Sequence, residues 1–147
     1  MTASREIERQ VAERAAGRCE YCRMRQSLQG ATLHVEHIVP RSQGGGTTPG
    51  NLAWAGPRCN LQKADRVESP DPSTGSPTRL FHPRLNDWSE HFSWEGFELL
   101  GLTAIGRATI AALDLNHARR IRIREVEALV GLFRPRETGP SGGGKPR

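Results

Sequence analysis

The feature that most restricts the fold of this chain is the placement of its three cysteines, all within the first 59 residues. Cys19 and Cys22 are separated by two residues, a spacing typical of a tight knuckle that brings two thiols together. The third thiol, Cys59, follows much later. Three cysteines are too few, and odd in number, for a disulfide scaffold. The pattern therefore favours a small knuckle-based module in a reducing, cytoplasmic setting.

Short elements are predicted around these cysteines. Ser4 can cap an N-terminal helix. Residues 32–39 are rich in β-branched side chains and predict a strand or hairpin arm that Pro40 ends. Residues 41–50 contain four glycines and a proline and predict a loop. Residues 59–66 contain neither Gly nor Pro and predict a short helix.

The remainder of the chain predicts a different organisation. Residues 68–78 are rich in proline and serine, and we expect a linker there between a module at 1–67 and a C-terminal extension. The extension, residues 79–134, predicts short strands followed by two helices, and residues 135–147 predict a disordered tail. The expected fold class is α+β.

Length and charge narrow the classes of function. The chain has 147 residues, 35% of them hydrophobic, which suits one ordinary domain or a module with an appendage. No apolar run is long enough to span a membrane, and the N-terminus lacks the apolar core of a signal peptide. The net charge is +5, and residues 1–66 contain ten Lys and Arg against six Asp and Glu. This surplus favours an anionic partner such as DNA, although many inert domains are equally basic.

Residues between Cys19 and Lys63 have the chemistry that phosphodiester hydrolysis needs. That reaction requires a base to activate water and a cation to stabilise charge on the phosphate. A neutral histidine such as His37 can be the base, and a carboxylate and an amide such as Glu36 and Asn60 suit Mg²⁺ or Mn²⁺. Asn51 could tie down the loop or hold His37 in one tautomer. Taken alone, the His-Val-Glu-His segment is more typical of ordinary surface charge.

Taken together, these residues resemble the HNH endonuclease family over residues 19 to 66. The resemblance is carried by Cys19-x2-Cys22, His34-Val35-Glu36-His37-Ile38-Val39-Pro40-Arg41-Ser42, Gly44-Gly45, Asn51-Leu52 and Cys59-Asn60-x2-Lys63. It implies a ββα-metal fold, in which a hairpin is followed by a helix.

The resemblance also implies a role for each matching residue in an H-N-N variant of the family. His37 matches the general base and Glu36 the adjacent acidic metal ligand. Asn51 matches the middle asparagine, which orients the base and braces the loop, and Asn60 matches the third position on the metal. His34 is then either an additional ligand or a residue that supports the ligands.

Contacts with the substrate follow from the same match. Arg41 and Lys63 would lie near the scissile phosphate of DNA. Without the motif, both side chains would be interpreted as ordinary solvated charges.

Many members of this family hold a structural zinc with two pairs of cysteines. Here Cys19, Cys22 and Cys59 match three of those positions, whereas the fourth is Gly56. Structural zinc usually takes four ligands. A distant histidine could supply the fourth, as could solvent, or the knuckle could be held by packing alone. The candidate histidines are His82, His91 and His117.

The C-terminal half allows two interpretations of its aromatic and basic residues. The aromatic side chains could stack on bases, or they could form the core of this half. They are Trp88, Phe92, Trp94 and Phe97. The arginines between 119 and 124 could contact phosphates or form a solvated face.

The sequence therefore predicts a metal-dependent DNA endonuclease of the HNH type, with one divalent cation (Mg²⁺ or Mn²⁺) and a histidine base. Two alternatives from other classes remain. One is a DNA-binding module that has kept the fold and lost catalysis, and the other is a small zinc ribbon that recruits partners.

Overall fold

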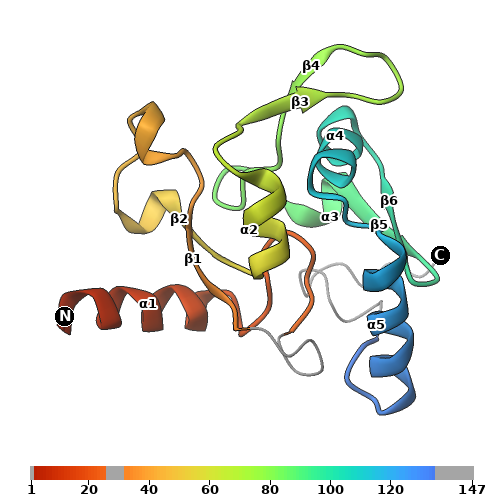
Figure 1. The fold of residues 1–147 in the computed structure, drawn as a ribbon, viewed down its shortest axis with the longest axis horizontal. Helices are drawn as coiled ribbons and strands as arrows, with labels where there is room; N and C mark the ends of the chain where they lie inside the picture. Colours follow the sequence, from red (N-terminus) through yellow and green to blue (C-terminus); the bar gives the residue numbers. More distant parts are fainter. Residues whose placement is uncertain (1, 26–31, 135–147) are drawn as a thin grey trace.

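The computed structural model describes residues 2–25 and 32–134 (Figure 1). The α-helices are α1 (Thr2–Arg14), α2 (Pro57–Lys63), α3 (Trp88–His91), α4 (Ala104–Leu113) and α5 (Ala118–Leu129). The strands are β1 (His34–His37), β2 (Leu52–Ala55), β3 (Glu68–Pro70), β4 (Pro77–Arg79), β5 (Phe92–Glu95) and β6 (Glu98–Gly101). Two 3-10 turns, η2 (Arg41–Gln43) and η3 (Pro49–Asn51), lie between β1 and β2. The fold class is α+β, as predicted.

The predicted hairpin and helix form as β1, β2 and α2. β1 and β2 are antiparallel, with His34 opposite Ala55 and His37 opposite Leu52. The connecting loop turns at Gly44, whose φ of 91° suits a residue without a Cβ. α2 follows directly after β2, so this part of the chain has the expected ββα order.

Two local predictions require correction. α1 begins at Thr2, so Ser4 lies inside the helix rather than capping it. The segment predicted as a Pro/Ser-rich linker, residues 68–78, forms strand β3 and all of β4 except Arg79, and the two strands pair in antiparallel fashion. The hairpin is tied to α4, because both Asp71 carboxylate oxygens accept hydrogen bonds from Arg107, at 3.0 and 2.8 Å. A segment whose composition is typical of a linker therefore forms a hairpin, and the Asp71–Arg107 ion pair attaches this hairpin to α4.

The extension beyond residue 79 has the two predicted short strands and the two predicted helices, α4 and α5, and it also contains the short helix α3, which was not predicted. β5 and β6 form a hairpin, and Thr103 caps α4 by accepting a hydrogen bond from the amide of Gly106. Trp88 and Phe92 are buried in the core, which supports the packing interpretation of these aromatic side chains over base stacking. The predicted disordered tail, residues 135–147, lies outside the described residues.

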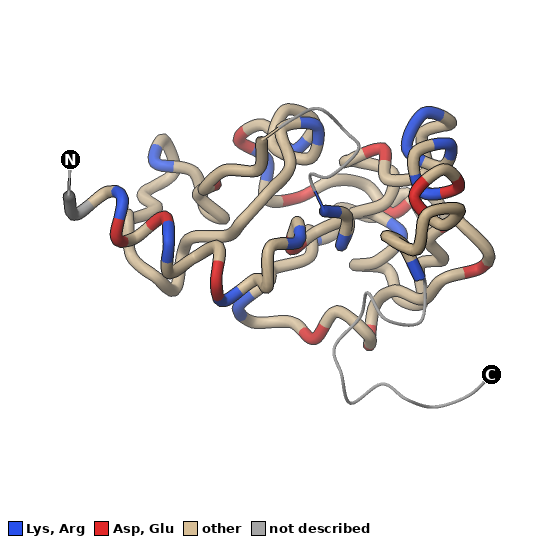
Figure 2. The backbone as a smooth tube through the Cα atoms, turned by 90° about the horizontal axis from the view of Figure 1, so that it is seen from below, with Lys and Arg blue, Asp and Glu red and all other residues tan. Residues whose placement is uncertain are grey.

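One hydrophobic core connects the two parts of the chain. Its buried members come from the knuckle, from β2 and α2, and from α4 and the segments on either side of it; they include Tyr21, Ala53, Cys59, Phe81 and Leu113. Figure 2 shows acidic and basic positions interspersed along both parts of the backbone. No helix among the described residues is long and apolar enough to cross a membrane.

Candidate active site and cysteine cluster

Two polar pairs join α2 to β1. The Nδ2 atom of Asn60 lies 2.9 Å from Nε2 of His34, and the Nζ atom of Lys63 lies 2.8 Å from Oε2 of Glu36. His34 and Glu36 are two residues apart on a strand, and Asn60 and Lys63 are three apart on a helix, so each couple shares one face. The structure therefore brings the predicted residues Glu36 and Asn60 to the interface between the same two elements.

The Glu36 carboxylate is almost fully buried, with 4% of the residue exposed. Its Oε1 atom accepts a hydrogen bond of 2.7 Å from the hydroxyl of Tyr21. Burial, together with the negative charge of Glu36, raises the pKa of Tyr21 well above its usual range, so the phenol remains a donor. Tyr21 was not predicted as a site residue. Its position between Cys19 and Cys22 is the one feature of the sequence that could have indicated it.

Lys63 does not fit the predicted role of a DNA contact. Only 1% of the residue is exposed, and its ammonium donates to the carbonyl oxygen of Ile38 at 2.8 Å while pairing with Glu36. A lysine buried in this way is stabilised by its acidic partner rather than by a phosphate in solution. We therefore correct this assignment: Lys63 joins α2 to β1.

His37 follows Glu36 directly and is the last residue of β1, where the strand ends. It is half-buried, and its Nε2 atom lies 2.9 Å from Oγ1 of Thr47 in the exposed loop. Thr47 was not identified from the sequence, because nothing in its neighbourhood indicates which side chain it meets. This contact connects the candidate base directly to the glycine-rich loop.

Asn51 braces this loop through three hydrogen bonds. Its Oδ1 atom accepts from the amide of Val39 at 2.9 Å, and its Nδ2 atom donates to the carbonyl oxygens of Val39 at 3.0 Å and Gly46 at 2.9 Å. Gly45 passes so close to this arrangement that a Cβ on it would overlap the Val39 carbonyl oxygen. Asn51 is connected to His37 through the loop, because Thr47, which follows Gly46, contacts the ring.

Arg41 lies at the start of η2 and is exposed to solvent. It therefore differs from Lys63, because its guanidinium is accessible to a ligand. The loop that carries it is also attached to the end of α2, since Gln43 donates a hydrogen bond of 2.6 Å to the carbonyl oxygen of Asp65.

The segment that contains β1, β2 and α2 lies within the match to a protein-family model. The model of the HNH endonuclease family matches residues 19–66. Residues 19–66 form an HNH endonuclease family domain. No curated protein and no solved structure matches the chain. Membership of this family suggests nuclease activity on DNA and implies a divalent metal ion.

The donor chemistry of the HNH domain fits a hard divalent cation. A carboxylate and an amide oxygen are ligands that Mg²⁺ and Mn²⁺ prefer. Both oxygens of the Glu36 carboxylate already have partners, Oε1 the hydroxyl of Tyr21 and Oε2 the ammonium of Lys63 at 2.8 Å, so a cation on Glu36 would compete with Lys63. In Asn60 the amide nitrogen bonds to His34, which leaves its oxygen outside that bond.

The three cysteines of the HNH domain converge as the sequence predicts. All are buried and unpaired by disulfides, and their Sγ atoms lie within 4.8 Å of one another. Hydrogen bonds with Cys19 and Cys59 lower the pKa of the Cys22 thiol well below its usual range, while burial raises the pKa of Cys19 to about 12. Three buried thiols that converge this closely could bind zinc.

None of the candidate histidines completes a fourth ligand position within the described part of the chain. They make other hydrogen bonds: His82 with the amide of Arg84, His91 with Thr103 and His117 with the amide of Arg119. The side chain that does meet the cluster was not predicted from the sequence. Arg120 of α5 is 6% exposed and donates to Cys59 Sγ at 3.1 Å and to the Leu113 carbonyl oxygen at 3.0 Å. Its positive charge also helps to lower the pKa of the Cys22 thiol.

Proposed function

We propose that this protein is a metal-dependent DNA endonuclease that hydrolyses phosphodiester bonds with His37 as general base. The observation that supports this most directly is the pairing of β1 with α2 inside an HNH family domain. It brings Glu36 and Asn60 to one interface, and His37 follows Glu36 directly on the strand.

In this proposal Thr47 and Asn51 position the base. When Nε2–H of His37 donates to Thr47, the other ring nitrogen, Nδ1, has the lone pair that takes the proton from water. Asn51 holds the carbonyl of Gly46, the residue before Thr47. Asn51 therefore acts on His37 through the loop, rather than by touching the ring.

Glu36 and Asn60 would hold the divalent cation. Bound there, the cation would stabilise negative charge on the phosphate and on the leaving 3′-oxygen. Tyr21 fixes one oxygen of Glu36, and the hydrogen bond from Asn60 to His34 orients the amide, so His34 is better assigned as a support for the ligands. The exposed Arg41 would contact the DNA backbone.

The test is conversion of supercoiled plasmid to nicked and linear forms in the presence of Mg²⁺ or Mn²⁺. We expect the wild-type protein to convert the plasmid and EDTA to stop the reaction. His37→Ala should lower the rate by about 10²- to 10⁴-fold, which is the usual contribution of a general base.

A matched control uses a histidine outside the proposed site. His117 caps α5 through its side chain, and asparagine is an equally good capping residue, so His117→Asn should keep full activity. Equal conversion by wild type and His37→Ala would refute the role of His37. Salt-dependent DNA binding without any metal-dependent nicking would favour the alternative of a non-catalytic module.

A further inference from the structure

We propose that the C-terminal extension helps to position the Glu36 carboxylate for metal binding, through two hydrogen bonds that run from Trp88 to Tyr21 and from Tyr21 to Glu36. The inference rests on the proposed function, because it concerns the residue proposed to hold the cation. It deepens that proposal, because Trp88 lies outside residues 19–66, which the family model matches. Tyr21 and Trp88 are positioning residues in this account, since they act on the cation through Glu36.

The first link is the hydrogen bond between Tyr21 and Glu36. The phenol donates to Oε1 at 2.7 Å, and the two residues are only 1% and 4% exposed. Lys63 pairs with the other carboxylate oxygen, Oε2. A cation on Glu36 competes with the ammonium of Lys63 by charge, whereas an uncharged phenol can keep its hydrogen bond to Oε1. Tyr21 is therefore the partner that can fix the orientation of the carboxylate both with and without the cation.

The second link joins Tyr21 to the C-terminal extension. Nε1 of Trp88 donates to the carbonyl oxygen of Tyr21 at 3.0 Å, and Trp88 is only 3% exposed. The ring of Tyr21 also packs edge-on against Phe81, with the ring centroids 6.4 Å apart. The guanidinium of Arg23 lies over the Trp88 ring, 5.1 Å from its centroid. A buried indole N–H needs an acceptor, so the bond to Tyr21 fixes the backbone of Tyr21 against the extension.

The hairpin of the HNH domain holds the same segment from the other direction. The amide of Glu20 donates to the carbonyl oxygen of Trp54 at 2.8 Å, and the amide of Trp54 donates to Oε2 of Glu20 at 2.9 Å. Trp54 lies on β2, opposite Val35 of β1, and Glu36 follows Val35. These bonds fix the residue before Tyr21 close to the strand position of Glu36, which favours a constant distance between the phenol and the carboxylate.

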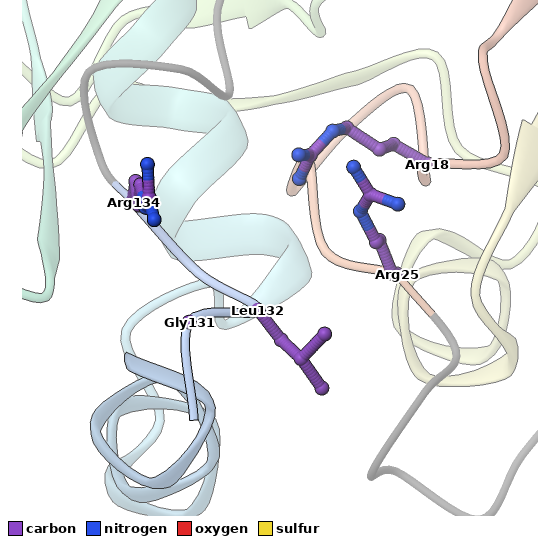
Figure 3. A pocket seen from close by; sticks show the side chains of 5 residues that line it. All are labelled: Arg18, Arg25, Gly131, Leu132 and Arg134. Carbon is purple, nitrogen blue, oxygen red and sulfur yellow. The ribbon is translucent and has the colours of Figure 1, made fainter. Parts of the chain in front are cut away.

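The knuckle meets the extension at a second place. Arg18 and Arg25, on either side of the knuckle, pair across an isolated antiparallel bridge. Figure 3 shows their side chains together with that of Leu132, which lies in the segment that follows α5; all three line one pocket. The extension therefore borders the knuckle both at this pocket and at Trp88, and the contact at Trp88 is the one that reaches Tyr21.

The test measures metal binding separately from cleavage. The affinity for Mn²⁺ is obtained from the electron paramagnetic resonance signal of free Mn²⁺, for the wild type and for Tyr21→Phe, which keeps the ring and removes only the hydroxyl. We expect Tyr21→Phe to bind Mn²⁺ about 10- to 100-fold more weakly, the usual cost of losing a partner that orients a metal ligand. The control is Thr103→Val, which removes the hydroxyl that caps α4 and should bind Mn²⁺ as the wild type does.

A double variant tests the route through Trp88. Trp88→Phe removes the indole N–H and should also weaken Mn²⁺ binding, by a smaller factor than Tyr21→Phe. In the Tyr21→Phe background the same change should have no further effect, because Trp88 acts on Glu36 only through the Tyr21 hydroxyl. An equal loss of affinity in both backgrounds would overturn the role of Trp88, since a general loss of core packing acts in both alike.

Plasmid nicking by the wild type separates this inference from the proposed function. Unchanged Mn²⁺ affinity in Tyr21→Phe, with a wild type that nicks plasmid, would overturn the positioning role and leave the proposed function intact. Weaker Mn²⁺ binding in Tyr21→Phe, with a wild type that never nicks, would support the positioning role and refute the nuclease function. A wild type that neither binds Mn²⁺ nor nicks plasmid would refute both.

Discussion

The Nζ atom of Lys63 lies 2.8 Å from Oε2 of Glu36, and the two side chains are only 2% and 3% exposed. This buried ion pair joins α2 to β1 at the position where the family resemblance predicts a metal ligand. Removing one partner of a buried pair leaves an uncompensated charge in a region of low dielectric constant, which is more costly than replacing both partners.

We therefore expect Lys63→Met to lower the free energy of unfolding by about 3–5 kcal/mol. Urea denaturation measures this change. The control is Arg9→Met, which breaks exposed ion pairs with Glu6 and Glu13 and should change the free energy of unfolding much less than Lys63→Met. Adding Glu36→Gln to Lys63→Met should recover part of the loss; a further, additive loss would contradict the pairing.

Thr47 should affect the rate of DNA nicking, because in the proposed mechanism its hydroxyl positions His37. Thr47→Val removes the hydroxyl that meets Nε2, and a misplaced base costs about 10- to 100-fold in nicking rate. Thr47→Ser keeps the hydroxyl and should restore most of the rate. The neighbouring exposed variant Thr48→Val should keep the nicking rate of the wild type. If Ser and Val at position 47 behaved alike, the hydroxyl would have no positioning role.

The glycine-rich loop should not tolerate a side chain at residue 45. A Cβ there would overlap the carbonyl oxygen of Val39 and approach Nδ2 of Asn51 within 2.7 Å, so Gly45→Ala must displace the loop that carries Thr47. We expect lower nicking activity and a lower unfolding midpoint. Gly50→Ala is the matched control, since a Cβ at Gly50 meets nothing within 4 Å. Equal activity of the two alanine variants would contradict this account.

The ion pair in the hairpin formed by β3 and β4 should make the stability of the protein depend on pH in the acidic range. Hydrogen bonds from Arg107 hold the pKa of Asp71 at about 2, below its usual value of 3.8. Between these values the unfolded chain binds more protons than the folded one, so this contribution is fully present above about pH 4 and is lost as the pH falls toward 2. Unfolding midpoints measured from about pH 5 to pH 2 should fall more steeply in wild type than in Asp71→Asn. Parallel curves would show that the ion pair contributes no acid sensitivity.

Removal of metal should leave the cysteine knuckle folded. The knuckle is held by contacts other than thiolates: Arg120 donates to Cys59, and Nε1 of Trp88 donates to the carbonyl oxygen of Tyr21 at 3.0 Å. We expect EDTA to remove any bound zinc, measured by elemental analysis, with little change in the circular dichroism spectrum. Arg120→Met should lower the thermal midpoint whether or not EDTA is present. Unfolding by EDTA alone would show instead that zinc stabilises the knuckle, as in zinc fingers.

Local sequence signals predicted the elements around the site well. The β-branched run predicted β1, and the glycines and Pro40 predicted the loop. These signals act through backbone preferences and through contacts a few residues apart, so they can be recognised without knowing the fold. The hairpin formed by β3 and β4 was missed because the Asp71–Arg107 ion pair that stabilises it joins distant segments.

The sequence by itself determined the HNH motif, the order of hairpin and helix, and the convergence of the three cysteines. It could not show which groups the motif residues meet, because those contacts join segments that are far apart in the chain. Only the tertiary structure placed Tyr21 and Lys63 on Glu36, Thr47 on His37, and Arg120 on Cys59. A lysine predicted at the DNA surface is therefore a buried partner of the acidic residue, since burial depends on packing between elements rather than on residue type.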